Sequence, residues 1–345
     1  MKRTYFALLT LVILVVFSGC SSSAGGAAAE KDTLTIAWLP NESGSDFTEA
    51  RDEIGKIIEE KTGKKVKHQT TTDYIVAIEA IANGNADISF LGAQGYIEAH
   101  NKNEKVLPLV VRSGESGTLE DAVYYSWLAV NKDNVDEYKN GDEFSIDHIK
   151  GKKFSFVSNS STSGFKVPSQ GIVDYFSKKD EFKNLKAEDL LQGGKNQFFS
   201  EVLYGGSHQG SAVNLLSNKA DVAAFCDSCV NTYVELADGE ENHAGAVYKV
   251  KEGAAEPFNT VVGKEFSLIS ATPVLNAPFA INSENVDKDL QAKLVDILTS
   301  DAVTNNEKVF VPEDSKFTGL FTKKGDERLV EVDDSWFNPI RELSK

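Results

Sequence analysis

The sequence predicts an α/β fold built as two lobes of similar construction. Short β-branched and apolar runs alternate with helical patterns, which is typical of α/β units around a mostly parallel sheet. The alternation covers residues 33–92 and resumes over 152–226, so two halves of the same kind follow one another. The chain has 345 residues. This length is enough for two domains even after removal of a leader.

The first twenty residues stand apart from this pattern. A basic start and the apolar run TYFALLTLVILVVF lead to small residues before Cys20, as in a secretory leader rather than a membrane span. The motif FSGC resembles a bacterial lipobox, in which the cysteine is acylated, although Phe17 departs from the usual leucine. We expect a lipoprotein signal peptide at 1–19 and a flexible tether at 20–31. The alternative is an ordinary signal peptide whose cleavage removes Cys20.

The charge of the chain and its cysteine content exclude some classes of function. The net charge is −16 and the basic residues are scattered, which argues against a nucleic-acid partner. Removing Cys20 leaves Cys226 and Cys229 in the motif CDSC, for which a disulfide is the leading interpretation in an oxidising compartment. Two free thiols, a redox pair, or a zinc site with His208 or His243 are the alternatives. We expect no metal and no cofactor.

The predicted elements follow one another in a regular order. In the first half they are a strand at 33–39, a helix at 46–63, a strand at 65–70, a helix at 73–84 and a strand at 86–92. In the second half they are a strand at 152–158, a helix at 164–179, a strand at 198–205, a helix at 208–219 and a strand at 220–226.

Two extended stretches are predicted to carry the chain between the lobes. They are VYYSWLAVNKD at 123–133 and EFSLISATPVLNAPFAIN at 265–282, the latter just before a helix at 286–300. Two crossing strands form a hinge around which a cleft can close. We expect lobe 1 to comprise 32–125 plus 279–345, and lobe 2 to comprise 126–278.

A local repeat relates the two halves. NGNADISFLG and SNKADVAAFC share a helix end, Ala-Asp and an apolar strand, and Asp87 and Asp221 are 134 positions apart. The same offset places Tyr74 opposite His208. Each of these rings follows a good N-cap residue, an aspartate or a serine, so each is predicted to stand at a helix N-terminus.

The stretch NSSTSGFKVPS is the best candidate for an anion site. Ser161, Thr162 and Ser163 lie between a strand and a helix predicted to begin near Gly164. A helix N-terminus attracts oxyanions through free N–H groups, and hydroxyls add donors. Lys166 is the only fixed charge of the stretch, so we expect binding without an arginine. Plain N-capping by a serine or threonine is the alternative. Tyr124, on the first crossing strand, could face the same space.

Four stretches together resemble the phosphate, phosphite and phosphonate substrate-binding proteins of ABC importers. They are, in order, TTDYIVAIEAIANGNADISFLG, YYSWLAVNKD, SNSSTSGFKVPS and GGSHQGSAVNLLSNKADVAA. The most specific element is STSGF-x-VP. The resemblance implies a type II periplasmic-binding-protein fold, with two α/β lobes joined by two hinge crossovers. It also implies a ligand oxyanion held by Ser161, Thr162, Ser163, His208, Tyr74 and Tyr124.

Two departures from that family concern the far side of the pocket. Relatives that bind aminoalkyl phosphonates carry an acid where this chain has Ala277, and a second acid near FCDSCV, where only Asp227 is present. An aminophosphonate ligand is therefore disfavoured. Asp227 could instead accept a hydrogen bond from a protonated P–OH, or simply cap a following helix. The long segment 227–265 is expected to be a solvated insertion, with a role at the pocket rim as the alternative.

The expected function is capture of a small phosphorus oxyanion by a lipid-anchored monomer on the outer face of the cytoplasmic membrane. The ligand would be a phosphonate, phosphite or phosphate, handed to the transmembrane permease subunits of an ABC importer, with no reaction. Another small anion, such as a sulfonate or a phosphorylated metabolite, is the alternative ligand. A hydrolase using Ser161 or Ser163 with His208 as base lacks a G-x-S-x-G motif and an orienting acid. A redox or adhesion lipoprotein on the same fold, with CDSC as its active element, is the remaining alternative.

Overall fold

The computed structural model describes residues 31–141, 143–313, 315 and 317–343. The predicted signal peptide and the predicted lipidation residue Cys20 lie outside the described residues. All the helices and strands below belong to one compact unit, Asp32–Lys345.

The first of two large sheets has six strands in the order β17-β4-β14-β3-β1-β2. β1 is parallel to both of its neighbours, whereas β14 and β17 run antiparallel to theirs. The strands are β1 (Thr33–Trp38), β2 (Lys65–Thr70), β3 (Ile88–Phe90), β4 (Val106–Arg112), β14 (Pro278–Asn282) and β17 (Leu329–Glu331). The first half of the chain thus needs a C-terminal strand on each side of β4 to complete its sheet.

The second large sheet has seven strands in the order β11-β12-β13-β5-β10-β8-β9. β8 is parallel to β9 and β10, and the other pairs are antiparallel. The strands are β5 (Val123–Asn131), β8 (Lys153–Phe156), β9 (Glu201–Tyr204), β10 (Val222–Cys226), β11 (Val234–Asp238), β12 (Val247–Val250) and β13 (Glu265–Leu275). Two small pairs complete the strands: β6 (Lys139–Asn140) with β7 (Glu143–Phe144), and β15 (Phe310–Pro312) with β16 (Phe321–Lys323).

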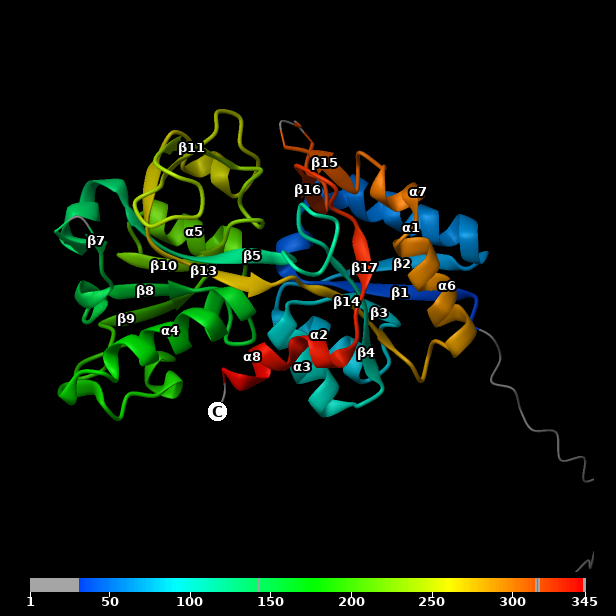
Figure 1. The fold of residues 1–345 in the computed structure, drawn as a ribbon, viewed down its shortest axis with the longest axis horizontal. Helices are drawn as coiled ribbons and strands as arrows, with labels where there is room; N and C mark the ends of the chain where they lie inside the picture. The colour runs from blue at the N-terminus through cyan, green and yellow to red at the C-terminus, as the bar shows by residue number, and fades with distance from the viewer. Residues whose placement is uncertain (1–30, 142, 314, 316, 344–345) are drawn as a thin grey trace, which may run out of the picture. The chain divides into compact units, whose positions relative to one another are not determined.

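Helices cover both faces of each large sheet, so each lobe has an α/β construction (Figure 1). In the first lobe α2, α3 and α8 share one face, while α1, α6 and α7 share the other. In the second lobe α4 and α5 pack on opposite faces. The helices are α1 (Thr48–Thr62), α2 (Tyr74–Ala82), α3 (Ala93–Lys102), α4 (Val167–Phe176), α5 (His208–Leu216), α6 (Lys288–Leu298), α7 (Asp301–Thr304) and α8 (Asn338–Glu342).

The predicted crossings correspond to β5 and to the turn between β13 and β14. β5 and β13 pair antiparallel along almost their whole length, from Val123 opposite Leu275 to Asn131 opposite Phe266. The two connections between the lobes therefore lie side by side (Figure 1). Our proposed boundaries after residues 125 and 278 fall inside β5 and β14.

The predicted repeat has a structural counterpart. The carboxylate of Asp87 accepts a hydrogen bond from the Thr35 N–H at 2.7 Å, and Asp221 accepts one from the Lys153 N–H at 2.8 Å. Each aspartate thus ties the start of its own strand to the backbone of the neighbouring parallel strand. The predicted caps are also confirmed: Asp73 accepts from the Ile75 N–H at the start of α2, and Ser207 accepts from the Gly210 N–H at the start of α5.

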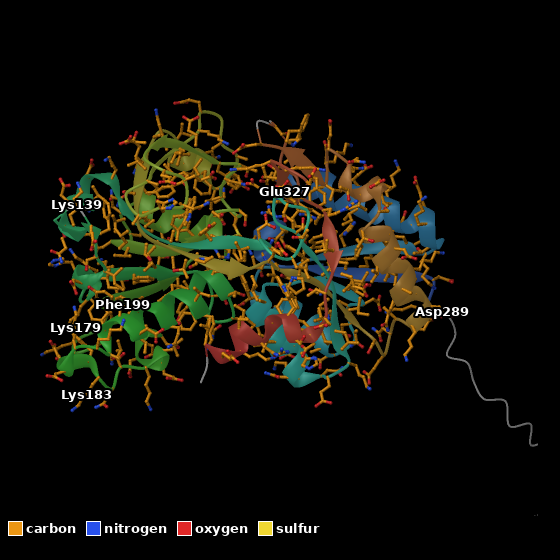
Figure 2. All side chains as sticks on the ribbon, in the orientation of Figure 1. Lys139, Lys179, Lys183, Phe199, Asp289 and Glu327 are labelled. Carbon is orange, nitrogen blue, oxygen red and sulfur yellow. A yellow bond between two sulfur atoms is a disulfide. The ribbon has the colours of Figure 1, made fainter. Side chains whose placement is uncertain are left out.

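Charged side chains project from the outer faces of the lobes. In Figure 2, Lys139, Lys179 and Lys183 lie at the outer edge of the second lobe, and Asp289 lies at the outer edge of the first. Within the described residues, no helix has the length and apolar character needed to cross a bilayer.

Candidate ligand-binding site

A cavity of about 90 Å³ lies between the two sheets. A single water needs only about 10–15 Å³ on this scale, so the space suits a small ligand. The cavity is lined by residues of both lobes, including six of the seven predicted ligand-binding residues. These six are Tyr74, Tyr124, Ser161, Thr162, Ser163 and His208.

Ser161, Thr162 and Ser163 are almost completely buried, and each has a different role at the cavity. The Ser161 hydroxyl accepts from the Gly164 N–H at 3.1 Å, so it caps the π-helical turn Thr162–Lys166 that precedes α4. The Thr162 hydroxyl accepts from the Gln94 N–H at 2.9 Å and so contacts the other lobe. The Ser163 hydroxyl lies near the Tyr124 phenol but makes no well-formed hydrogen bond to any described residue.

Gly164 is required by packing rather than by close approach to a ligand. A Cβ at this position would lie 2.3 Å from the Val157 Cγ2 atom. The predicted anion loop is thus held against the end of β8 by a contact that only glycine permits.

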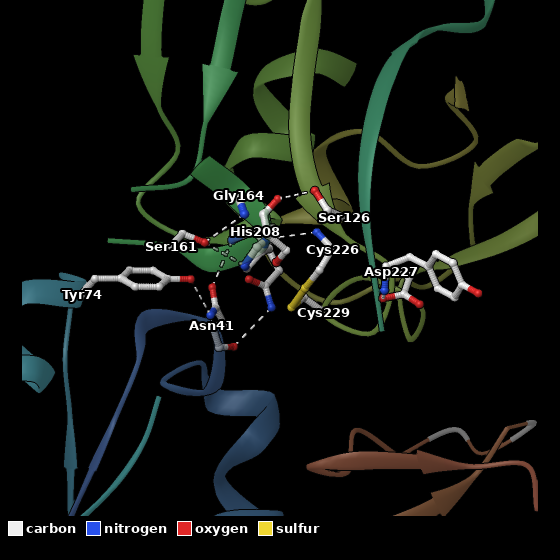
Figure 3. Close-up of a disulfide and its surroundings, with 12 residues drawn as sticks. Asn41, Tyr74, Ser126, Ser161, Gly164, His208, Cys226, Asp227 and Cys229 are labelled. Atoms are coloured by element: carbon white, nitrogen blue, oxygen red, sulfur yellow. Dashed lines mark hydrogen bonds between the residues drawn. A yellow bond between two sulfur atoms is a disulfide. The ribbon is translucent and has the colours of Figure 1, made fainter. Parts of the chain in front are cut away.

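His208 presents a fixed N–H group toward this loop. Its Nδ1 atom accepts from the Cys226 N–H at 3.0 Å, which leaves the proton of the neutral ring on Nε2 (Figure 3). Nε2 lies 3.4 Å from the Ser161 Oγ atom. Burial lowers the pKa of His208 to about 3, so the ring is neutral at physiological pH. A neutral donor can bind an anion, but a ring of such low basicity is a poor general base for hydrolysis.

Tyr74 and His208 are brought together by an asparagine that the sequence did not single out. Asn41 donates from Nδ2 to the Tyr74 hydroxyl at 2.8 Å. Its Oδ1 atom accepts from the backbone N–H of His208 at 3.1 Å (Figure 3). The Gln209 side chain donates to the Asn41 carbonyl at 3.2 Å. Asn41 follows β1, whereas α5 belongs to the other lobe, so these bonds join the lobes across the cavity.

The phenols of Tyr74 and Tyr124 are both protonated and neutral, so each can donate or accept a hydrogen bond. Burial raises the pKa of each phenol above its ordinary value. Tyr124 lies on β5, the first crossing strand, as predicted, and both rings are at least nine-tenths buried.

Arg112 also lines the cavity, contrary to our expectation of a site without an arginine. It is the last residue of β4, and its Nε atom is buried without a hydrogen-bond partner among the described residues. Burial lowers the pKa of Arg112, and the nearby Asp227 carboxylate opposes that effect. Since an arginine stays protonated in proteins, Arg112 supplies a positive charge at the cavity. Lys166 is not among the residues that line it.

Glu42 is the acidic side chain among the described residues that line the cavity. It ends the short turn Pro40–Glu42 after β1, and its Oε2 atom is buried without a hydrogen-bond partner among the residues that the structure describes. Burial raises the pKa of Glu42 to about 8.

Asp227, the seventh predicted residue, is not among the residues that line the cavity. Its carboxylate accepts from the Tyr125 N–H on β5 at 2.9 Å, and its carbonyl accepts from the Val230 and Asn231 N–H groups. Burial raises the pKa of Asp227 to about 6, while the Tyr125 hydrogen bond acts in the opposite direction. Residues 228–233 form turns rather than a helix, so Asp227 ties this turn to β5 and does not cap a following helix.

Cys226 and Cys229 are joined by a disulfide beside His208 (Figure 3). The two sulfurs and a ring nitrogen of His208 lie within 4.8 Å of one another. A disulfide offers no thiolate, so in this oxidised form the group is not a zinc ligand set.

The rest of the cavity wall is mixed. Its apolar side chains are Leu39, Phe47, Phe90, Ala277, Leu320 and Phe321, and its further polar residues include Gln209, Ser228, Asn231, Thr232, Asn276 and Thr322. Apolar lining beside a few polar groups suits an anion with a small substituent.

The fold and the sequence agree on a single family. A sequence profile described as the periplasmic substrate-binding protein of ABC phosphonate transporters matches residues 36–337. The chain is 26% identical over 263 residues to the phosphate-import protein PhnD of Mycolicibacterium smegmatis, covering 73% of this chain and 75% of that protein.

Two solved structures share the fold at low sequence identity. The binding component of a phosphonate ABC transporter from Pseudomonas aeruginosa has a TM-score of 0.63 at 19% identity, with 90% of this chain and 85% of that chain covered. PhnD1 from Prochlorococcus marinus, solved with methylphosphonate, has a TM-score of 0.60 at 14% identity, with 90% and 97% covered. The predicted type II periplasmic-binding-protein fold is confirmed. The chain belongs to the periplasmic substrate-binding proteins of phosphonate ABC transporters.

Proposed function

We propose that this chain captures a small phosphorus oxyanion, such as phosphate, phosphite or a small phosphonate, in the cavity between its lobes. One observation carries the proposal: the Ser163 hydroxyl and the Arg112 Nε atom are buried at the cavity wall without hydrogen-bond partners in the described part of the chain. Each unsatisfied buried polar group costs about 1–3 kcal/mol, and native proteins satisfy most of them. An oxyanion would accept from both.

The proposed ligand contacts combine one cation with neutral donors. Arg112 supplies charge, while Ser163 and the Nε2–H of His208 supply directed hydrogen bonds. Neutral donors hold an anion strongly in a dry site without several buried counter-charges. The name of the mycobacterial relative, a phosphate-import protein, is consistent with this ligand class.

A thermal-shift screen tests the ligand class. The mature protein is heated with phosphate, phosphite, methylphosphonate, aminoethylphosphonate, sulfate or methanesulfonate. A ligand at a hundred times its Kd stabilises the folded state by roughly 2.7 kcal/mol, which raises the unfolding midpoint. We expect at least one phosphorus oxyanion to do so. Stabilisation by sulfate or methanesulfonate alone would favour the sulfonate alternative, and no shift by any phosphorus oxyanion would refute the proposal.

Asp227 has an indirect role in this proposal. The charge of its carboxylate attracts the Arg112 guanidinium. Asp227 can therefore help to position Arg112 without contacting the ligand. Direct acceptance of a ligand P–OH by Asp227 stays a prediction. Titration calorimetry of Asp227→Asn across pH checks it, because unchanged affinity and unchanged pH dependence would exclude that contact.

We also propose that Cys20 is acylated and anchors the protein to the outer face of the cytoplasmic membrane, where it delivers ligand to the permease as a monomer. The support is the leader sequence and its lipobox-like FSGC. In cells, wild-type protein should partition with membranes and Cys20→Ala should not be retained there. Retention of the variant, or an unlipidated mass for the wild-type protein, would contradict the anchor. Light scattering of the purified protein checks the monomer.

A further inference from the structure

Glu42 is a buried acid that the fold leaves without an obvious structural task. Its side chain is nine-tenths buried, lines the cavity, and leaves Oε2 without a partner among the described residues. A charged carboxylate in such a place is costly unless it is paired. The atom is therefore available to a ligand.

Its own backbone, the Arg51 charge and the Asn41 side chain favour an ionised Glu42 carboxylate, but burial outweighs them. The nearest cation, Arg51 on α1, donates to the backbone carbonyls of Glu42 and Gly44 rather than to the carboxylate. Tyr74 on α2 and Tyr124 on β5 are close enough for the Glu42 charge to raise the pKa of both phenols.

Two further titratable groups share the cavity with Glu42. His208 on α5 is neutral, because burial lowers its pKa to about 3. Arg112 on β4 is the cation among the described lining residues. Burial raises the pKa of Glu42 to about 8, which favours a protonated Glu42 at neutral pH before ligand binds.

We propose that Glu42 is a specificity-determining ligand-binding residue that shares one proton with the bound oxyanion. As a neutral acid it donates its O–H to a fully ionised oxyanion. As a carboxylate it accepts only from a ligand that carries a P–OH group, and it repels one that does not. This inference rests on the proposed function and adds to it a rule for ligand choice.

The proton balance distinguishes phosphate from phosphonates. The hydrogen phosphate dianion keeps one P–OH, so an ionised Glu42 can accept that proton and binding needs none from solvent. The methylphosphonate dianion has no O–H, so its complex with an ionised Glu42 must take up one proton. Above the pKa of Glu42 its affinity therefore falls by up to about tenfold per pH unit, whereas that of phosphate does not fall through this group.

The test is the ratio of two dissociation constants, for methylphosphonate over phosphate, measured by titration calorimetry between about pH 7.5 and pH 9.5. In the wild-type protein the ratio should rise by about tenfold or more across this range, with proton uptake detected for methylphosphonate in buffers of different ionisation enthalpy. Glu42→Gln keeps a donor and an acceptor but cannot ionise, so its ratio should stay flat. Glu49→Gln, an exposed acid on α1, is the matched control and should behave as the wild type.

Each other outcome counts against the inference in a recognisable way. A flat ratio in the wild-type protein, or the same rise in Glu42→Gln, overturns the role of Glu42 while leaving the proposed function intact. Binding of phosphate but not of methylphosphonate or phosphite at about pH 7.5 also overturns it, since a neutral Glu42 should donate to all three. Tighter binding of aminoethylphosphonate as pH rises would assign Glu42 to an ammonium group instead. If no phosphorus oxyanion binds at any pH, the proposed function itself fails. Circular dichroism and thermal unfolding establish that each variant is folded.

Discussion

The three neighbouring hydroxyls of the anion loop should respond differently to the same substitution. The Ser163 hydroxyl makes no well-formed hydrogen bond to a described residue, whereas Ser161 accepts from the Gly164 N–H and Thr162 accepts from the Gln94 N–H. Ser163 is therefore the hydroxyl most available to a ligand, and Ser161 is the one most committed to the fold.

The expected magnitudes follow from these partners. Ser163→Ala removes a buried hydroxyl with no partner, so the free energy of unfolding without ligand should stay the same or rise slightly. Ligand binding should weaken by about 1.5–3 kcal/mol, the range for a hydrogen bond to a charged group, or roughly 10- to 150-fold in Kd. Ser161→Ala removes an N-cap and should lower the free energy of unfolding by about 1 kcal/mol.

Calorimetry gives the affinities, and urea unfolding without ligand gives the stabilities. Ser163 is not a ligand contact if Ser163→Ala loses as much unfolding free energy as Ser161→Ala while keeping wild-type affinity. In that case all three hydroxyls would serve the fold, as the N-capping alternative predicts.

Further predictions concern charge, pH, closure and the disulfide. Arg112→Gln should weaken oxyanion binding and make it less sensitive to salt, because the variant loses the cation at the cavity; equal salt dependence would contradict this. The pKa of His208 is depressed because the folded protein favours the neutral ring. The contribution of the neutral ring to the free energy of unfolding is therefore complete above about pH 6.5. It is lost as pH falls toward 3, by up to about 1.4 kcal/mol per pH unit. The His208→Gln variant should accordingly lose less stability than the wild type on acidification in urea unfolding. Asn41→Ala should shift the ligand-free protein toward an open form in small-angle scattering, since Asn41 bonds both lobes; an unchanged profile would show that other contacts set closure. Serine at both Cys226 and Cys229 should cost about 2 kcal/mol of stability for so short a loop while leaving affinity within about threefold, because His208 is held by a backbone N–H. Loss of binding in that double variant would revive a functional role for CDSC.

The order of the elements could be predicted because each carries a local signal. The helices α2 and α5 begin at Tyr74 and His208 because a short polar side chain immediately before each accepts from the first turn. The repeated Ala-Asp motif predicted the equivalence of the two halves, and Asp87 and Asp221 make the same contact to a neighbouring strand.

The charged part of the site could not be predicted in the same way. Arg112 ends β4 and Glu42 lies in the turn after β1, and nothing in their local sequence shows that the Arg112 Nε atom and the Glu42 side chain are buried at a cavity. Burial of a charge depends on how two lobes meet, which involves residues far apart in the chain. The one available signal was position, because ligands of open α/β sheets gather near the carboxyl ends of strands.

Asn41 was missed for a similar reason. Its side chain bonds a tyrosine of one lobe and a backbone N–H of the other, so its role exists only once the lobes are closed. Asp227 shows the opposite case, since its sequence position suggested the pocket but its carboxylate is used by the Tyr125 N–H.

The most direct test of the account is a crystal structure of the mature protein grown with phosphate or methylphosphonate, whichever gives the larger thermal shift. We predict density for the oxyanion in the interlobe cavity, with an oxygen within about 2.7–3.0 Å of the Ser163 hydroxyl and others at Arg112 and at the Nε2 atom of His208. A ligand bound elsewhere, with the cavity filled only by water, would contradict the central claim.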